Sequence, residues 1–254
     1  MKDIIEYLCS SAVACRSRRN GELSEKCLRC LADLVGWVDV NLISSDKVLS
    51  TIYSSLQDDV LSGSGCACLA ELVKKGMDIG SKINLVLSIN LLPVLNNIPI
   101  GDSDDTDGCE DELGVCVNAL AEELLTALGT YESALSTQNY SEENLAIINA
   151  APHLIGVLRM CLDLLLRLFA HPDSDVVVTV IPAVTKMVHI LKVQKACEAR
   201  PAAAGSPARL PLPLSAYLPQ VLRSLYRQIQ LPSGFSFEEL FDEGSELLEV
   251  PTSS

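Results

Sequence analysis

The sequence predicts an all-α fold, an α-α superhelix in which antiparallel helix pairs stack into a solenoid. Three observations support this prediction. Hydrophobic residues recur every three or four positions, and strand-like alternation is not seen. Aromatic residues make up only 4% of a chain that is 48% hydrophobic, so Leu, Val, Ile, Ala and Cys must fill the core. Short breaks separate the helical segments, as in stacked helix pairs.

The first half of the chain divides into successive helices. The first opens at Ile4 and ends at Asn20-Gly21, and the second begins with Ser24 as its N-cap. A Ser/Gly run precedes the fourth helix, and we expect the fifth to bend at Pro93. The predicted ranges after the first helix are 23–38, 47–56, from the end of the 62–65 run to 75, and 79–95.

The second half holds four further helical stretches and three segments of unusual composition. Residues 101–112 carry no periodic apolar residue and predict an exposed acidic loop between helices. Helices are expected over 113–131, over 141–169 with a kink or restart at Pro152, over 175–195 and over 216–230. A Pro/Ala-rich insert at 198–213 is expected to be flexible, and the acidic tail at 235–254 is expected to be partly disordered.

This succession of about nine helices is typical of a HEAT-type array, whose units of roughly 40 to 47 residues would give about five repeats. We therefore expect residues 1–254 to form a single HEAT-type segment. The prediction depends on the order of helices, because the sequence repeat itself is weak.

The formal net charge of −14 opposes nucleic-acid binding, but the charge is local. Residues 101–112 hold seven acids and residues 238–249 hold six, with no base in either stretch. The rest of the chain carries 20 acids and 19 bases, so a basic patch remains possible there. The acidic loop has two interpretations, a solubilising insert or a docking site for a basic protein surface.

No residue set predicts catalysis, a metal site or a cofactor, and we expect no enzyme activity. Cys27 and Cys30 form a CxxC and Cys66 and Cys68 a second close pair, but structural zinc needs converging pairs or spaced histidines. Core packing is therefore the favoured role for the ten cysteines. The three histidines are isolated in sequence, which favours ordinary turn and helix roles.

The sequence also predicts an intracellular protein without membrane insertion. Ten cysteines without a stapled, loop-rich pattern fit a reducing compartment, and acids near the N-terminus interrupt any signal-peptide core. Two apolar stretches, 154–170 and 176–193, contain charged residues or Pro182 and fall short of a clean span of about 20 residues.

Clustered bases are the candidate RNA contacts. They are Arg16, Arg18 and Arg19 at the first inter-helix turn, Lys74 and Lys75 at a helix end, and Arg223 and Arg227 one helical turn apart. The alternative for the lysine pair is that a helix C-terminus attracts cations through its dipole without any ligand.

Several stretches in order resemble the tRNA exportins (exportin-T), members of the importin-β/karyopherin superfamily. They are 27–43 (CLRCLADLVGWVDVNLI), 66–78 (CACLAELVKKGMD), 82–86 (KINLV), 168–176 (LFAHPDSDV), 189–192 (HILK), and the 218–230 helix followed by 235–238 (FSFE). The resemblance covers nearly the full chain. The Ala/Pro stretch at 198–213 has no recognisable counterpart in the family.

The resemblance implies a nuclear export receptor that shuttles between nucleus and cytoplasm. Such a receptor loads tRNA together with the GTP-bound small GTPase Ran and passes through the nuclear pore, in contact with nuclear pore proteins. Family members are several times longer, so we expect this chain to be an internal fragment. The alternative function is a helical-repeat protein-protein scaffold without an RNA ligand. A basic stripe on the concave face would favour RNA binding, and bases scattered on the convex face would favour the scaffold.

Overall fold

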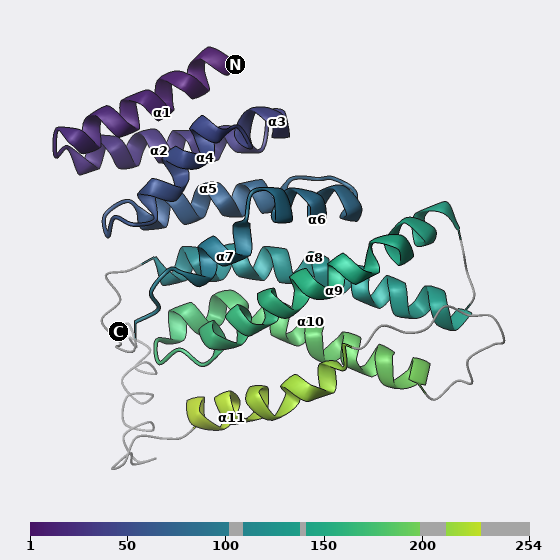
Figure 1. Ribbon diagram of the computed structural model, residues 1–254. Coiled ribbons are helices and arrows are strands. Elements are labelled where there is room, and N and C mark those ends of the chain that lie inside the picture. The colour runs from purple at the N-terminus through teal and green to yellow at the C-terminus, as the bar shows by residue number, and fades with distance from the viewer. Residues whose placement is uncertain (102–108, 138–140, 199–211, 230–254) are drawn as a thin grey trace, which may run out of the picture.

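Helices stacked in chain order make up the structure. The computed structural model describes residues 1–101, 109–137, 141–198 and 212–229, apart from the side chain of residue 143, and this part of the chain contains helices and no strand. Figure 1 shows the helices arranged one above the next from the N-terminus to α11. The predicted all-α, HEAT-type solenoid is confirmed.

The helices in chain order are α1 (Lys2–Ser17), α2 (Gly21–Val35), α3 (Val40–Ile43), α4 (Asp46–Ser55), α5 (Ser62–Lys74), α6 (Ile79–Ser88), α7 (Leu91–Asn96), α8 (Glu110–Thr137), α9 (Glu142–Phe169), α10 (Ser174–Glu198), the 3-10 helix η1 (Leu214–Tyr217) and α11 (Leu218–Gln228).

Two layers of helices form the solenoid. In one layer α2 contacts α5, α5 contacts α8, and α8 contacts α10. Helices α2 and α5 run in the same direction, because the Cys68 thiol reaches the carbonyl of Leu28 while Lys75 reaches that of Val35 further along both helices. Helices α8 and α10 do so too, because Asn118 accepts from the Ala183 amide while Glu132 accepts from Gln194 further along both helices. The other layer contains α1, α4, α6, α7, α9 and α11, with α9 contacting α6, α7 and α11. Each layer covers the apolar side of the other.

A continuous hydrophobic core runs between the layers, from Ile5 in α1 to Val221 in α11. The long central helix α8 makes the closest approach at Gly114, where an added Cβ would overlap the side chain of Thr179 in α10. Glycine in a helix costs stability, but here it lets two parallel helices pack backbone to side chain.

Two helix starts differ from the prediction. Helix α2 begins at Gly21, because the side chain of Asn20 accepts a hydrogen bond from the Leu23 amide and serves as the N-cap. Ser24 is instead buried inside α2 and donates to the Ala12 carbonyl. Helix α5 begins at Ser62, within the Ser/Gly run, and a Cβ at Gly65 would lie 2.5 Å from the Ser55 hydroxyl. The run therefore allows close packing and does not delay the helix.

The proline-containing segments also differ from expectation. The predicted helix at 79–95 is two helices, separated by Asn90 in the left-handed region at φ 54°. Pro93 lies in the first turn of α7, where the missing amide hydrogen costs little. Helix α9 starts directly after Ser141, the first residue of the predicted range 141–169, and continues through Pro152 without the expected kink or restart. Helix α10 also continues through Pro182, but in agreement with the predicted range 175–195.

The segments of unusual composition lie largely outside the described residues. The acidic loop predicted over 101–112 ends earlier, because α8 begins at Glu110 and places three acids in its first turn, where the helix dipole favours negative charge. Residues 102–108, 199–211 and 230–254 are not described. At the end of the 198–213 segment, Leu212 is buried and its carbonyl accepts a hydrogen bond from Gln194.

By length and composition alone, three helices, α8, α9 and α10, are suited to cross a membrane. In the solenoid they pack on one another, and the most apolar window of α8 is 61% buried by the rest of the protein. Helix packing thus accounts for much of their apolar surface. The absence of membrane insertion stays a prediction.

Candidate nucleic-acid interface

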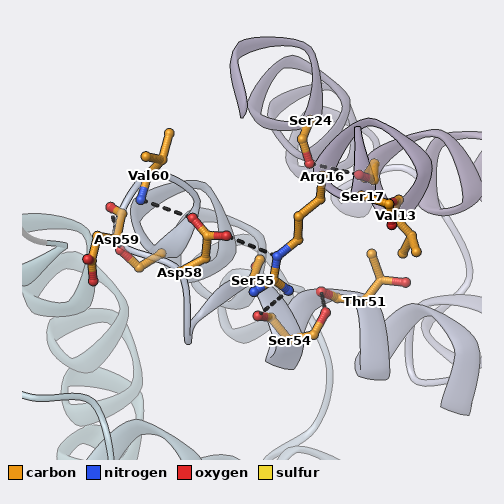
Figure 2. Close-up of polar contacts among 12 residues, drawn as sticks. Val13, Arg16, Ser17, Ser24, Thr51, Ser54, Ser55, Asp58, Asp59 and Val60 are labelled. Atoms are coloured by element: carbon orange, nitrogen blue, oxygen red, sulfur yellow. Dashed lines mark hydrogen bonds and ion pairs between the residues drawn. The ribbon is translucent and has the colours of Figure 1, made fainter. Parts of the chain in front are cut away.

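Arg16 links the first helix pair to the second. Its Nε donates to the Asp58 carboxylate at 2.9 Å, and its Nη1 donates to the Ser54 carbonyl at 2.9 Å, as Figure 2 shows. Asp58 also accepts a hydrogen bond from the Val60 amide, which shapes the turn before α5. The guanidinium is therefore occupied by protein acceptors. Arg18 and Arg19 lie beside it in the turn between α1 and α2 and are exposed.

Lys75 and Lys74 both have partners within the protein. The Nζ of Lys75 donates to three carbonyls at the end of α2, those of Val35 at 2.8 Å, Gly36 at 3.3 Å and Val38 at 2.5 Å. It thereby supplies the cation that a helix C-terminus attracts. Lys74 pairs with Glu71 at 2.8 Å on the exposed face of α5.

Arg223 and Arg227 lie on α11, which contacts α9, a helix with exposed arginines of its own. The Gln228 side chain donates to the Phe169 carbonyl at 2.7 Å, and Tyr217 lies within electrostatic reach of Asp163 and Arg159, so α11 runs along the C-terminal half of α9. We call the exposed face of these two helices the α9–α11 surface; its charged residues are Arg159, Asp163, Arg167, Arg223 and Arg227. Helix α11 has no acidic residue.

Helix α11 separates its exposed side chains by type. Val221 and Ser224 face the core, Arg223 and Arg227 project on one flank, and the other flank carries apolar side chains. These are Leu222, Leu225, Tyr226 and Ile229, of which Tyr226 is 62% exposed. Arginines beside an exposed aromatic ring suit phosphate contact together with base stacking.

The layer of α2, α5, α8 and α10 is mixed in charge. A groove between α2, α5 and α8 is lined by three acidic residues, Asp33, Glu71 and Glu112, and by one basic residue, Lys74. The described part of this layer therefore presents no basic stripe. Its exposed or half-buried charges include Lys26, Arg29, Asp33, Glu71, Lys74, Asp111, Glu112, Glu122, Asp175, Lys186 and Lys192.

The structure does not bring the predicted basic residues into one patch. Arg18 and Arg19 lie beside α1, at one end of the stack, whereas Arg223 and Arg227 lie on α11 at the other end (Figure 1). Within the described residues, the α9–α11 surface carries four exposed arginines. Two of its members, Arg159 and Arg167, are absent from the set predicted from sequence.

The sequence signal for Arg159 and Arg167 was present but ambiguous. Their four-residue spacing with Asp163 predicts a solvated stripe on a soluble helix, and the structure agrees that all three are exposed. That stripe becomes part of a larger surface only because α11 contacts α9. Phe169 and Leu218 are separated by 48 residues, and no sequence pattern predicts that the two helices meet.

The described residues contain no group of three or more His, Cys, Asp or Glu side chains placed to hold a metal ion. Of the predicted core cysteines, Cys9, Cys66, Cys68, Cys109, Cys116, Cys161 and Cys197 are buried. In the CxxC, Cys27 is half-buried and Cys30 is exposed. His171 is a turn residue whose Nδ1 accepts from the Asp173 amide at 3.1 Å.

The chain matches known proteins of nuclear transport. Residues 1–69 match the family model described as Exportin 1-like protein. Exportin-T of Mus musculus is 28% identical over 174 residues, which are 68% of this chain and 17% of that protein. Exportin-T of Danio rerio is 26% identical over the same shares of both chains. Exportin-T of Botryotinia fuckeliana is 24% identical over 88% of this chain and 21% of its own length. The aligned part thus spans about a fifth of these relatives.

Proposed function

We propose that this chain, which is similar to exportin-T over 68% to 88% of its length, serves in a nuclear export receptor of the importin-β superfamily that binds tRNA in cooperation with Ran-GTP. In this proposal the receptor carries its cargo from nucleus to cytoplasm and contacts nuclear pore proteins on the way. The α9–α11 surface is the proposed RNA contact. The observation that carries this assignment is the contact between α9 and α11, two helices that both carry exposed arginines.

In the proposed contact, the arginines bind the phosphate groups of the RNA backbone. Guanidinium groups bind phosphate oxygens through two parallel hydrogen bonds, and folded RNA is recognised mainly by its shape and backbone. Tyr226 offers a ring on which an unpaired base can stack. A solenoid adds an extended surface that follows a folded RNA, which a single helix cannot provide.

The basic residues predicted from sequence fall into two groups, those whose side chains bond to protein partners and those that are exposed. Arg16 and Lys75 have protein acceptors within 3.3 Å, and Lys74 pairs with Glu71, so a phosphate would have to replace these interactions. Arg18 and Arg19 are exposed and remain proposed contacts at the other end of the stack.

The experiment is tRNA binding at fixed salt by a double variant, Arg223→Glu with Arg227→Glu, followed over a salt titration. We expect the affinity to fall at least tenfold, which corresponds to about 1.4 kcal/mol. The salt dependence should also become shallower, since fewer counterions are released when two phosphate contacts are lost.

A matched control separates local contact from general repulsion. Lys26→Glu with Arg29→Glu makes the same change in net charge on α2, where both bases pair with glutamates of their own helix. The control should keep most of the affinity. Equal loss in both variants would show that the α9–α11 surface has no special role.

The scaffold alternative has its own supporting observation, the acidic groove between α2, α5 and α8. Such a groove suits a basic peptide, and charge complementarity would mainly raise the association rate. Reversal of charge at Asp33 and Glu112 would then abolish binding of a Lys/Arg-rich peptide without any effect on tRNA. If tRNA binding is lost only in the α11 variant, the RNA-binding proposal stands over the scaffold.

A further inference from the structure

Two cysteines from different helices lie side by side between α5 and α8. Cys66 is in the second turn of α5 and is fully buried, and Cys109 directly precedes α8 and is 5% exposed. The Cys109 thiol hydrogen-bonds with the Cys66 thiol and with the Ser62 hydroxyl. Ser62 and Cys66 are four residues apart, so they occupy one face of α5. Cys109 therefore sits against a single turn of that helix.

The surrounding contacts hold this arrangement in place. Gly63 lies three residues before Cys66, and Glu112 lies three residues after Cys109. A Cβ built on Gly63 would lie 3.1 Å from the Glu112 carboxylate, so the Glu112 side chain of α8 reaches the backbone of α5 here. Other buried cysteines are arranged differently. The Cys68 thiol donates to the Leu28 carbonyl at 3.3 Å, and the Cys161 thiol donates to the Val117 carbonyl at 3.9 Å. Those thiols contact backbone acceptors, whereas Cys66 and Cys109 contact each other.

The environment divides the two thiols into different roles. The hydrogen bond from Cys66 lowers the pKa of Cys109 to about 7, against the opposing effects of burial and the nearby glutamates. The same hydrogen bond, together with burial, raises the pKa of the Cys66 thiol. The position of Cys109 at the start of α8 also favours a thiolate, because a helix N-terminus stabilises negative charge. Cys109 is thus the nucleophile, and Cys66 keeps its proton.

We propose that Cys66 and Cys109 form a reversible disulfide when the protein is oxidised by hydrogen peroxide, which joins α5 covalently to the start of α8. The Cys109 thiolate attacks one peroxide oxygen, the O–O bond breaks, and the departing hydroxide takes up a proton to become water. Cys109 is now a sulfenic acid, oxidised by two electrons. The Cys66 sulfur then attacks the Cys109 sulfur, the S–O bond breaks, and a second water leaves with the Cys66 proton. A dithiol reductant restores both thiols.

The disulfide would close a covalent loop of the chain that contains α6 and α7. It would fix the relative position of α5 and α8, which are neighbours in one layer of the solenoid. The curvature of a solenoid is set by small rotations between neighbouring repeats. The disulfide would therefore restrict the rotation of α5 relative to α8. Peroxide is small enough to reach a thiol with little exposure, and such low-pKa cysteines are the ones that oxidise selectively.

The test is peptide mapping of the whole chain after treatment with hydrogen peroxide. Free thiols are then blocked with iodoacetamide, and the protein is digested without reductant and analysed by mass spectrometry. We expect a peptide that joins Cys66 to Cys109, and its loss after treatment with dithiothreitol. This readout uses the native sequence, so it does not depend on the folding of a variant.

Variants identify the order of the two steps. In Cys66→Ser, the sulfenic acid on Cys109 should persist and be trapped by dimedone, and in Cys109→Ser, Cys66 should remain a free thiol. Cys68→Ser, another buried position of α5, should keep the cross-link. A native-sequence map in which exposed Cys30 is oxidised while Cys66 and Cys109 are both recovered as free thiols would overturn the proposal.

Discussion

At the scale of residues, several long cationic side chains hold helices together instead of facing a ligand. Arg16 joins α1 to the turn before α5, and Lys75 joins the end of α5 to the end of α2. Lys82 is the most buried of them, with its side chain 2% exposed. Its Nζ donates to the Val73 carbonyl at 2.6 Å and pairs with the Glu123 carboxylate, so it connects α6, α5 and α8.

Replacement of Lys82 by Met should destabilise the protein, because the Val73 carbonyl and Glu123 would lose their donor. We expect the free energy of unfolding to fall by about 2 to 3 kcal/mol, less than for a fully buried pair, since water can reach Glu123. Urea denaturation measures the change. Lys26→Met, which breaks an exposed pair with Glu22, should change stability little. Similar stability of the Lys82 variant and the native chain would contradict this role for Lys82.

At the scale of elements, α10 continues through Pro182 with help from α8. Proline has no amide hydrogen, and its ring displaces the carbonyl of the preceding turn, so nearby helical hydrogen bonds are lost. The Ala183 amide instead donates to the Asn118 side chain of α8 at 2.9 Å. The Asn118 amide group also donates to Glu122 at 3.3 Å. One side chain of α8 thus satisfies a donor that Pro182 releases.

This arrangement predicts a coupling that a double-mutant cycle can measure. Asn118→Ala should cost about 1 to 2 kcal/mol in the free energy of unfolding, because the Ala183 amide loses its acceptor. In a Pro182→Ala background the same change should cost at least about 0.5 kcal/mol less, because the Ala183 amide can then donate to a backbone carbonyl of its own helix. Additive costs would show that Asn118 does not compensate for Pro182. Asn84→Ala, an exposed position on α6, is the control.

Helix type and order could be predicted from sequence, but local compensation could not. The three-and-four periodicity predicted the succession of helices, and the start of α9 at Ser141 was predicted correctly. Pro152 suggested a kink or restart, yet α9 continues through it, whereas α10 continues through Pro182 as the predicted range 175–195 implies. Conversely, the break at Asn90 has only a weak sequence signal, because a single left-handed asparagine leaves the hydrophobic period almost unchanged. Tertiary contacts decide these cases, and they cannot be read from local pattern.

At the scale of the whole molecule, a group of acidic residues and a group of arginines lie on different helices of the described chain. The sequence predicts that the net charge of −14 is local, and the described helices agree, because exposed arginines gather on α9 and α11. The first turn of α8, by contrast, places Glu110, Asp111 and Glu112 together. Within the described chain, the proposed RNA contact on α9 and α11 therefore lies at one end of the solenoid, and the proposed contacts Arg18 and Arg19 lie at the other. That placement could not be predicted without the contact between α9 and α11.

The central claim is a coupling between two ligands, and one measurement tests it most directly. Binding of tRNA is measured at fixed salt by the native protein that carries this chain, with and without Ran locked in its GTP form. We predict that Ran-GTP tightens tRNA binding by a factor of about 5 or more, as expected for two ligands that favour one conformation. If Ran-GTP has no effect and tRNA binds no better than an unrelated RNA duplex, the claim is contradicted and the solenoid is a scaffold.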